Sequence, residues 1–212
     1  MPERIRQSLL NFENMVAASR YNAGGDEADV TKNKLGIIDP QELGDAETVL
    51  LTDSYDHFGA LLRKGKLKLK LNLLFELHKY FLDTLYTWAG KIRTVNISKG
   101  TMLFMPPHQI EKAFKAFASD FEKHNPQLGD PETEIARKIA FLHCELNVIH
   151  PFREGNGRTI RLFIDLLLEN CGYEGLDFRR VSEGEYITAC RKGTLKDYKL
   201  MEKIFRGLLK KK

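Results

Sequence analysis

The sequence is poor in cysteine and has no long apolar run. Its three cysteines, Cys144, Cys171 and Cys190, are odd in number and lack the spacing of metal ligands, so we expect reduced thiols rather than disulfides or a zinc site. No stretch is long and apolar enough to cross a bilayer, and the first residues lack the apolar run of a secretory signal. These absences predict a cytoplasmic protein that binds no membrane.

The sequence also carries only a small excess of positive over negative charge. The 33 Lys and Arg residues nearly balance the 29 Asp and Glu residues, and part of the net charge of +4 lies in the tail at residues 210–212. So small an excess gives no reason to expect direct binding of nucleic acid. The phosphate-binding sequence G-x-x-x-x-G-K-[ST] and the protein-kinase signature are also absent, which excludes those two routes to phosphate chemistry.

The 212 residues fit one globular domain, and their spacing of apolar residues predicts a mainly α-helical fold. Gly24-Gly25 breaks the first helical pattern, so residues 1–30 are interpreted as a helical extension and residues 31–212 as the single domain. His78 lies on an apolar face and is interpreted as a core histidine. We expect one helix that includes residues 5–16 and one that includes residues 40–51. Further helices are expected at residues 66–88, 108–124, 131–149, 159–172, 182–191 and 195–212.

Residues 91–105 depart from the helical pattern. β-Branched and aromatic residues flank the turn Ser98-Lys99-Gly100-Thr101 and favour two short strands, and Pro106-Pro107 ends the second strand. This is the one hairpin that the sequence predicts. Lys91, Arg93 and Lys99 make it basic, and a surface hairpin with solvated lysines is the simplest interpretation.

Residues 150–161, His-Pro-Phe-Arg-Glu-Gly-Asn-Gly-Arg-Thr-Ile-Arg, combine groups suited to phosphate chemistry. Gly155 and Gly157 let the backbone turn sharply and approach a ligand, and a helix follows. A glycine-rich turn at a helix N-terminus presents free N–H groups and the positive end of the helix dipole, which suits a phosphate. Arg158 and Arg161 are three residues apart and are expected to extend from one helix face toward that anion.

Two further side chains complete this set. Glu154 lies among positive groups, and a carboxylate there would repel a phosphate unless it holds a divalent cation that bridges to the phosphate oxygens. His150 precedes Pro151, which ends the incoming helix, and its imidazole can act as a general base near neutral pH. The stretch therefore predicts Mg²⁺-dependent chemistry on a nucleotide polyphosphate. A loop with a capping histidine and solvated arginines explains each residue singly but not the whole set.

The stretch matches His-x-Phe-x-(Asp/Glu)-Gly-Asn-Gly-Arg-x-x-Arg at every specified position, and the protein resembles the Fic family. The resemblance implies a Fic-type helical bundle with one small β-hairpin flap. It also implies that Arg158 contacts the β-phosphate of ATP, Arg161 the γ-phosphate, and Glu154 a Mg²⁺ ion. His150 would take the proton from a Tyr, Thr or Ser hydroxyl of a target protein while AMP is transferred and pyrophosphate leaves. The implied phosphate-binding residues are Gly155, Asn156, Gly157, Arg158 and Arg161.

The position of the hairpin matches the Fic flap, which in the family lies over the active site and docks the target segment. An edge strand can do this by pairing its backbone with an extended peptide. Bacterial relatives resemble toxins that modify type II topoisomerase subunits, whereas others are effectors delivered into host cells, where small GTPases are modified. The absence of a delivery domain favours an internal target. The implied docking residues are Ile97, Ser98, Lys99, Gly100 and Thr101.

Many Fic proteins are silenced by a helix carrying (Ser/Thr)-x-x-x-Glu-(Gly/Asn), whose glutamate pairs with the second arginine, here Arg161. No Ser or Thr of this chain fits, since Ser8 to Glu13 is one residue too long and turns Glu13 about 100° away from the Ser8 face. We therefore expect either an unrestrained enzyme or, preferably, a separate small antitoxin that supplies the glutamate. An inhibitory Glu13 is a third alternative.

Two other functions stay open on the same residues. The Fic scaffold can transfer UMP, phosphocholine or phosphate, and the sequence does not reveal the pocket that selects the base. A nucleotide-sensing or protein-binding module without turnover is the second alternative. The complete motif, including the base His150, argues against that second alternative.

Overall fold

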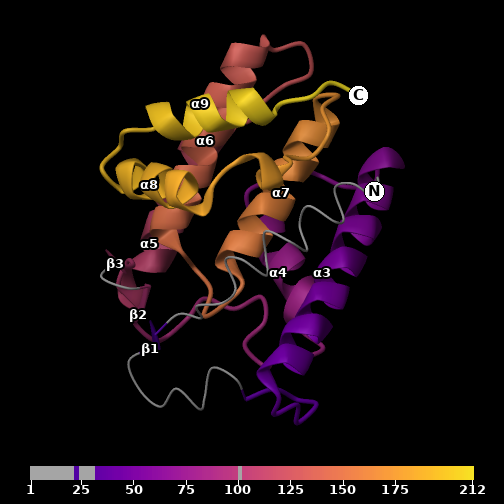
Figure 1. Cartoon of the computed structure of the whole chain (residues 1–212), viewed down its shortest axis with the longest axis vertical. Helices are drawn as coiled ribbons and strands as arrows, with labels where there is room; N and C mark the ends of the chain where they lie inside the picture. The colour runs from indigo at the N-terminus through magenta and orange to yellow at the C-terminus, as the bar shows by residue number, and fades with distance from the viewer. Residues whose placement is uncertain (1–21, 24–31, 100–101) are drawn as a thin grey trace.

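The computed structural model describes residues 22–23, 32–99 and 102–212, so the helix expected at residues 5–16, Glu13, Gly100 and Thr101 lie outside the described residues. The described part is mainly α-helical, as predicted (Figure 1). Its elements in chain order are β1 (Asn22–Ala23), α3 (Pro40–Arg63), α4 (Leu73–Leu82), β2 (Ile97–Lys99), β3 (Met102–Leu103), α5 (Pro107–His124), α6 (Glu132–Ile149), α7 (Asn156–Asn170), the 3-10 helix η1 (Phe178–Arg180), α8 (Glu183–Thr194) and α9 (Lys199–Leu208).

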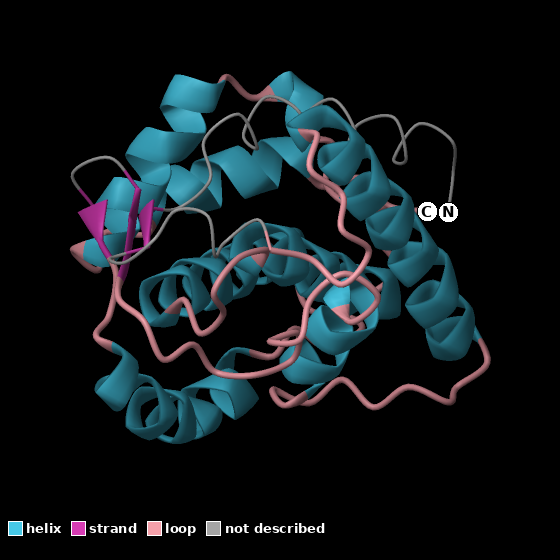
Figure 2. Cartoon of the chain, turned by 90° about the horizontal axis from the view of Figure 1, so that it is seen from below, coloured by secondary structure: helices cyan, strands magenta, loops and turns pink. Residues whose placement is uncertain are grey.

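α6 lies at the centre of the helices and contacts α5, α7, α8 and α9. α3 and α4 pack on each other and on α7 (Figures 1 and 2). α6 ends at Ile149 and α7 begins at Asn156, so the predicted motif forms the junction of these two helices. The stripe that anchors α6 is buried as predicted: Ile135, Ile139, Leu142, Leu146 and Ile149.

α3 starts where the sequence predicts and runs further than predicted. Asp39 is its N-cap, and its side chain accepts a hydrogen bond from the backbone N–H of Glu42 at 2.8 Å. The helix continues past Leu51, the last residue of the predicted pattern, because Tyr55 and Phe58 extend the buried stripe. α3 is therefore a long helix that extends along one side of the molecule (Figure 1).

The helix predicted at residues 66–88 is wrong at both ends, since α4 covers only residues 73–82. Residues 66–71 alternate lysine and leucine, and in the structure Leu67, Leu69 and Leu71 turn inward while the lysines are exposed. Alternation with a period of two belongs to extended chain and not to a helix. After residue 82 the chain forms a series of turns that bury Tyr86 completely.

The hairpin prediction is confirmed, and its sheet has one more strand than predicted. β2 pairs antiparallel with β3, with Ser98 opposite Leu103, but residues 91–96 form no strand. β1 pairs antiparallel with β2 on the other side, with Asn22 opposite Ser98 and Ala23 opposite Ile97. β2 is therefore the middle strand of the sheet. A peptide that pairs with β2 on the edge opposite β3 has to displace β1.

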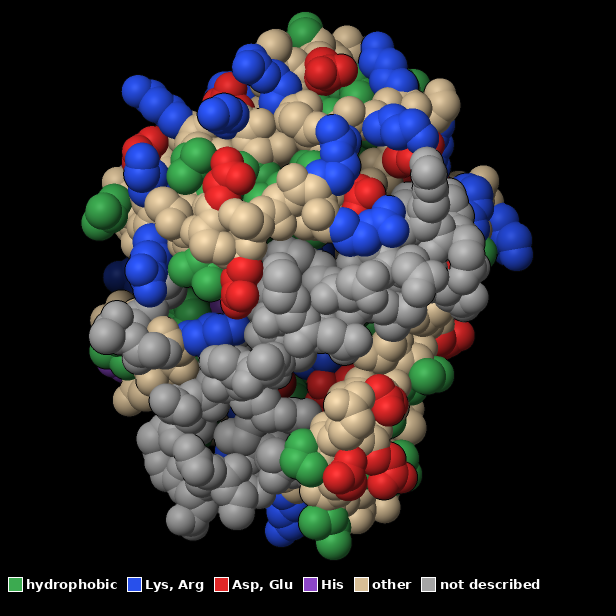
Figure 3. All heavy atoms as spheres, viewed as in Figure 1, with side chains coloured by type: hydrophobic (Ala, Val, Ile, Leu, Met, Phe, Trp, Pro, Cys, Tyr) green, Lys and Arg blue, Asp and Glu red, His purple; other side chains and the backbone are tan. Residues whose placement is uncertain are grey.

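No helix in the described residues combines the length and the apolar character needed to cross a membrane. On the face seen in Figure 3, Lys and Arg side chains gather over α9 and the C-terminal segment, whereas Asp and Glu side chains gather over the start of α3. Asp and Glu side chains also lie among the Lys and Arg side chains over α9, so neither charge is confined to one end of this face.

Candidate active site

His150 stands at the C-terminal end of α6 in the left-handed backbone conformation, with φ 48° and ψ 61°. This conformation is uncommon for any residue other than glycine. The Nδ1 atom lies 3.0 Å from the carbonyl oxygen of Asn147, and because a carbonyl only accepts, Nδ1 carries the proton. Nε2 is then the nitrogen with the lone pair. The imidazole stacks on Phe104, which directly follows β3, at a centroid distance of 3.7 Å.

The environment of His150 keeps the imidazole neutral. Its side chain is buried, and this burial lowers the pKa of His150 from 6.5 to about 3. The positive charges of Arg93 and Lys99 lower the pKa further, while the hydrogen bond to Asn147 opposes the shift. A neutral imidazole with a defined lone pair is the form that can accept a proton at pH 7.

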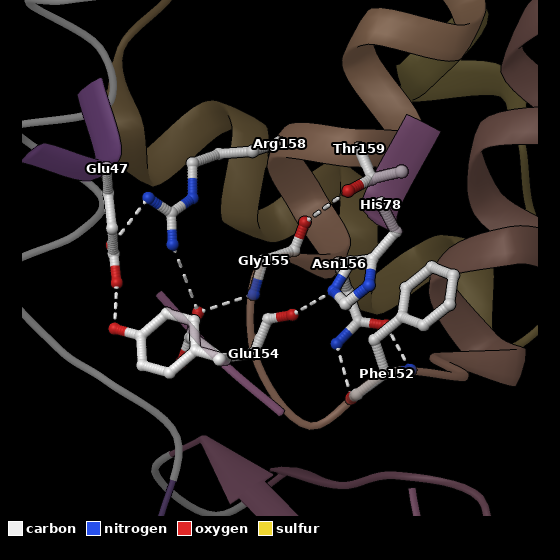
Figure 4. A network of polar contacts seen from close by, with 9 residues as sticks. Glu47, His78, Phe152, Glu154, Gly155, Asn156, Arg158 and Thr159 are labelled. Atoms are coloured by element: carbon white, nitrogen blue, oxygen red, sulfur yellow. Dashed lines mark hydrogen bonds and ion pairs between the residues drawn. The ribbon is translucent and has the colours of Figure 1, made fainter. Parts of the chain in front are cut away.

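The turn that follows His150 is shaped by the side chain of Asn156 (Figure 4). Its Oδ1 accepts a hydrogen bond from Phe152 N at 2.8 Å, and its Nδ2 donates to Phe152 O at 2.7 Å. Asn156 is fully buried, and both ends of its side-chain amide are engaged within the turn. The group of Asn156 that can bind an anion is therefore its backbone N–H at the start of α7. Gly155, the residue before α7, has φ 77°.

His78 supports this turn from α4, which confirms its interpretation as a core histidine. Its Nε2 donates to the carbonyl oxygen of Glu154 at 2.9 Å, and its Nδ1 accepts from the backbone N–H of Gly90 at 2.8 Å. The ring stacks on Phe152 at 3.7 Å. Burial lowers the pKa of His78 to about 3, so the ring is neutral and both nitrogens keep these roles at pH 7.

Arg158 makes an ion pair that the sequence analysis did not predict (Figure 4). Its Nη1 donates to Glu47 Oε2 of α3 at 2.8 Å, and the hydroxyl of Tyr86 donates to the same carboxylate. The guanidinium also lies 5.0 Å from the centroid of the Phe81 ring. The overlooked signal was a carboxylate within an apolar helical stripe, since Glu47 lies midway between the buried residues Leu43 and Leu51.

Arg161 borders the turn from a different side. Its guanidinium lies 5.8 Å from the Phe178 ring of η1, and a Cβ placed on Gly157 would be 3.2 Å from Arg161 Nη1. Arg158 instead reaches α3 and α4, so the two guanidinium groups contact different neighbours in this structure. Glycine at position 157 lets the guanidinium of Arg161 approach the backbone.

Glu154 is the carboxylate that could hold a metal ion. It is 8% exposed, its Oε1 accepts from Gly155 N at 2.8 Å, and Arg158 Nη2 lies 3.7 Å away. The described residues contain no group of three or more His, Cys, Asp or Glu side chains placed to bind a metal. Mg²⁺ commonly uses one or two protein carboxylates together with phosphate oxygens and water. A single carboxylate beside an anion turn fits such a nucleotide-bound ion.

Gly155→Ala is expected to lower the free energy of unfolding by about 2–5 kcal/mol. Left-handed backbone costs about 1–2 kcal/mol for a residue with a Cβ, and overpacking adds about 1–3 kcal/mol because the new Cβ would lie 2.9 Å from Leu82 Cδ1. Gly36→Ala is the matched control, since Gly36 has φ 69° and its Cβ would meet no atom within 4 Å. Urea unfolding gives the free energy of unfolding of both variants, and the difference between their losses is the packing contribution at Gly155. Equal losses in Gly155→Ala and Gly36→Ala would contradict that contribution.

Three comparisons with known proteins show the family of the chain. The model of the Fic/DOC family matches residues 68–168. The "Probable protein adenylyltransferase Fic" of Salmonella typhimurium (strain LT2) is 30% identical over 179 residues, which cover 84% of this chain and 86% of the relative. The protein of the same description from Escherichia coli (strain K12) is 29% identical, with the same coverage.

A solved structure is similar as well. The N-terminal Fic domain of a VirB-translocated effector protein from Bartonella sp. AR 15-3 matches with a TM-score of 0.69 and 26% identity, and the match covers 84% of this chain and 86% of that one. The residues that the family model matches include the junction of α6 and α7 described above. The chain belongs to the Fic/DOC family.

Proposed function

We propose that the protein is an adenylyltransferase that transfers AMP from ATP to a Tyr, Thr or Ser hydroxyl of a target protein. The observation that carries this proposal is His150, whose neutral imidazole keeps its lone pair on Nε2 and which stands at the start of the turn that leads into α7. The names of the relatives, which describe protein adenylyltransferases, support the same reaction.

Each residue of the junction has a role in this proposal. The N–H groups at the start of α7 and the guanidinium groups of Arg158 and Arg161 bind the phosphates of ATP. His150 Nε2 takes the proton of the target hydroxyl as its oxygen bonds to the α-phosphorus, and the bond to the pyrophosphate oxygen breaks. Glu154 would hold Mg²⁺, which would supply positive charge to the phosphate oxygens. Most of the rate enhancement then comes from positioning and from charge stabilisation.

The hairpin is the proposed docking site for the target, with Ile97, Ser98 and Lys99 of β2 and the adjoining Gly100 and Thr101. β1 already pairs with Ile97 and Ser98, so docking on that edge includes the displacement of residues 22–23. The target could be a topoisomerase subunit or a small GTPase in the cytoplasm of the bacterium or of a host cell. A separate antitoxin that inserts a glutamate beside Arg161 is the proposed control.

The test is incubation of the purified protein with Mg²⁺, α-labelled ATP and a bacterial lysate. Labelled protein that requires His150 is the expected result, and its mass identifies the target. Protein labelled by γ-labelled ATP and not by α-labelled ATP would show that the protein transfers phosphate as a kinase, which would contradict the proposal. Label from α-labelled UTP, GTP or CTP, but not from ATP, would show that AMP is the wrong group. Nucleotide binding without transfer to any protein of bacterial and host lysates would favour a binding module.

A further inference from the structure

Arg93 lies outside the motif and connects its backbone to the hairpin. Its side chain is buried with 3% exposure. The guanidinium donates to three backbone carbonyls, with Nε 2.9 Å from His150 O, Nη1 2.8 Å from Val95 O and Nη2 2.5 Å from Met105 O. The backbone N–H of Arg93 donates to Pro151 O at 2.9 Å. One residue thus binds two consecutive carbonyls of the motif and two carbonyls of the hairpin segment.

The acceptors of Arg93 are dipoles and not charges. Within the described residues no carboxylate lies within ion-pair distance of its guanidinium, and burial alone lowers the pKa of Arg93. A buried charge without a counter-ion is unfavourable unless hydrogen bonds satisfy it. The planar guanidinium can serve three acceptors in different directions at once, which a lysine ammonium on a flexible chain does less well. The site therefore requires the geometry of an arginine as well as its charge.

The three carbonyls that accept from the Arg93 guanidinium belong to the proposed base and to the two ends of the hairpin. Val95 precedes β2 and Met105 follows β3, so Arg93 ties together the two ends of the hairpin. Phe104, next to Met105, stacks on the His150 ring. His150 itself has a left-handed backbone, which costs about 1–2 kcal/mol and persists only where the surroundings hold it. A hydrogen bond to His150 O from Arg93 is one such constraint.

We propose that Arg93 is a positioning residue that holds the base His150 and the target-docking hairpin in one fixed arrangement. The inference rests on the proposed function and adds to it. A hydroxyl delivered by a peptide on the hairpin reaches His150 Nε2 only if the hairpin and the imidazole keep a constant relative position. A misplacement of about 1 Å can lower a rate by about 10²-fold.

The kinetic test uses Arg93→Met and Arg93→Lys, with Lys91→Met as the matched control. Lys91 is exposed in the same segment, so its replacement removes a charge and disturbs no carbonyl. We expect both Arg93 variants to lower kcat for AMP transfer by about 10²-fold and to raise KM for the target. Binding of a fluorescent ATP analogue should change little, because the Arg93 side chain makes no hydrogen bond to residues 154–158. Unchanged kcat and KM in folded Arg93→Lys would overturn the proposal.

Chemical rescue separates positioning from a general loss of structure. Ethylguanidinium added to Arg93→Ala is expected to restore part of kcat, whereas ethylammonium is not. Equal rescue by both ions would show that charge alone matters and would overturn the proposal. Circular dichroism shows whether each variant is folded. If Arg93→Ala and Arg93→Met do not fold, the kinetics of Arg93→Lys alone test the proposal.

Hydrogen exchange tests the inference without any enzymatic activity. The Phe104 N–H donates to Ile97 O at 3.2 Å across the hairpin. Arg93→Lys is expected to speed exchange at Phe104 and to shift the side-chain ¹⁵N resonances of His150, while amides in the middle of α6 keep their protection. Unaltered exchange at Phe104 with unaltered His150 resonances would overturn the positioning role. Absence of AMP transfer by the unsubstituted protein would instead contradict the proposed function alone.

Discussion

His150→Ala is expected to lower the rate of AMP transfer by about 10²–10⁴-fold, the usual contribution of a general base. The backbone contacts that place residue 150 do not need the imidazole, since Leu146 O accepts from His150 N and Arg93 donates to His150 O. The variant should therefore fold and still bind ATP. Transfer of label from α-labelled ATP to protein, measured beside the binding of a fluorescent ATP analogue, checks both expectations.

Two controls make the His150 result specific. His150→Asn keeps a neutral polar side chain that tolerates the left-handed backbone and lacks the basic nitrogen, so it should lose as much activity as His150→Ala. His57→Ala removes an exposed imidazole from α3 and should leave transfer unchanged. Full activity in either His150 variant would show that another group takes the proton.

The pH dependence of the reaction gives an independent check on His150. Protonation of Nε2 removes the lone pair, so activity is lost as pH falls through the pKa of the folded protein. Because that pKa is lowered from 6.5 to about 3, kcat/KM should show no loss with a midpoint near pH 6.5. Measurements between pH 5 and 8 cover the decisive range, and a midpoint near 6.5 would mean that the imidazole is solvated in the active protein.

The sequence predicted features that depend on neighbouring residues. The cap Asp39, the buried stripe of α6 and the glycine turn before α7 follow from local spacing and backbone chemistry, and each is present. The helix predicted over residues 66–72 was wrong because leucines at alternate positions were assigned a helical period. The alternation of lysine and leucine in this segment was visible in the sequence and should have predicted an extended chain.

Other features depend on residues that lie far apart in the chain. Glu47 and Arg158 are 111 positions apart, and Arg93 is 57 positions from His150. No periodic pattern specifies such pairs, since they arise from the packing of α3 on α7 and from the path of the hairpin. The motif identified the groups for chemistry, whereas the residues that hold those groups became visible only in the folded chain.

Breaking the buried pair of Glu47 and Arg158 is expected to lower the free energy of unfolding by about 3–5 kcal/mol. The two side chains are 4% and 11% exposed, so Glu47→Ala leaves the guanidinium without its hydrogen-bonded carboxylate and also deprives the Tyr86 hydroxyl of its acceptor. The expected result applies to Glu47→Ala and to Arg158→Ala. Urea unfolding monitored by circular dichroism measures it.

A double-mutant cycle with Glu47→Ala and Arg158→Ala separates the pair from its surroundings. The double variant removes both charges, so its loss should be smaller than the sum of the single losses by about 1–3 kcal/mol. The exposed pair Glu111 and Lys115 of α5 is the control, and its cycle should show no measurable coupling because water screens both charges. Additive losses at Glu47 and Arg158 would contradict the ion pair.

The single variant Glu47→Ala also shows whether Glu47 strengthens or weakens ATP binding. If the carboxylate holds the Arg158 guanidinium beside the turn at Gly155, Glu47→Ala weakens ATP binding, because the arginine then has to be ordered when the phosphates bind. We expect this result, since one carboxylate occupies Nη1 and a guanidinium has five N–H donors. Tighter ATP binding by Glu47→Ala would show instead that Glu47 competes with the phosphates for Arg158. Titration with a fluorescent ATP analogue at equal protein concentrations distinguishes the two results.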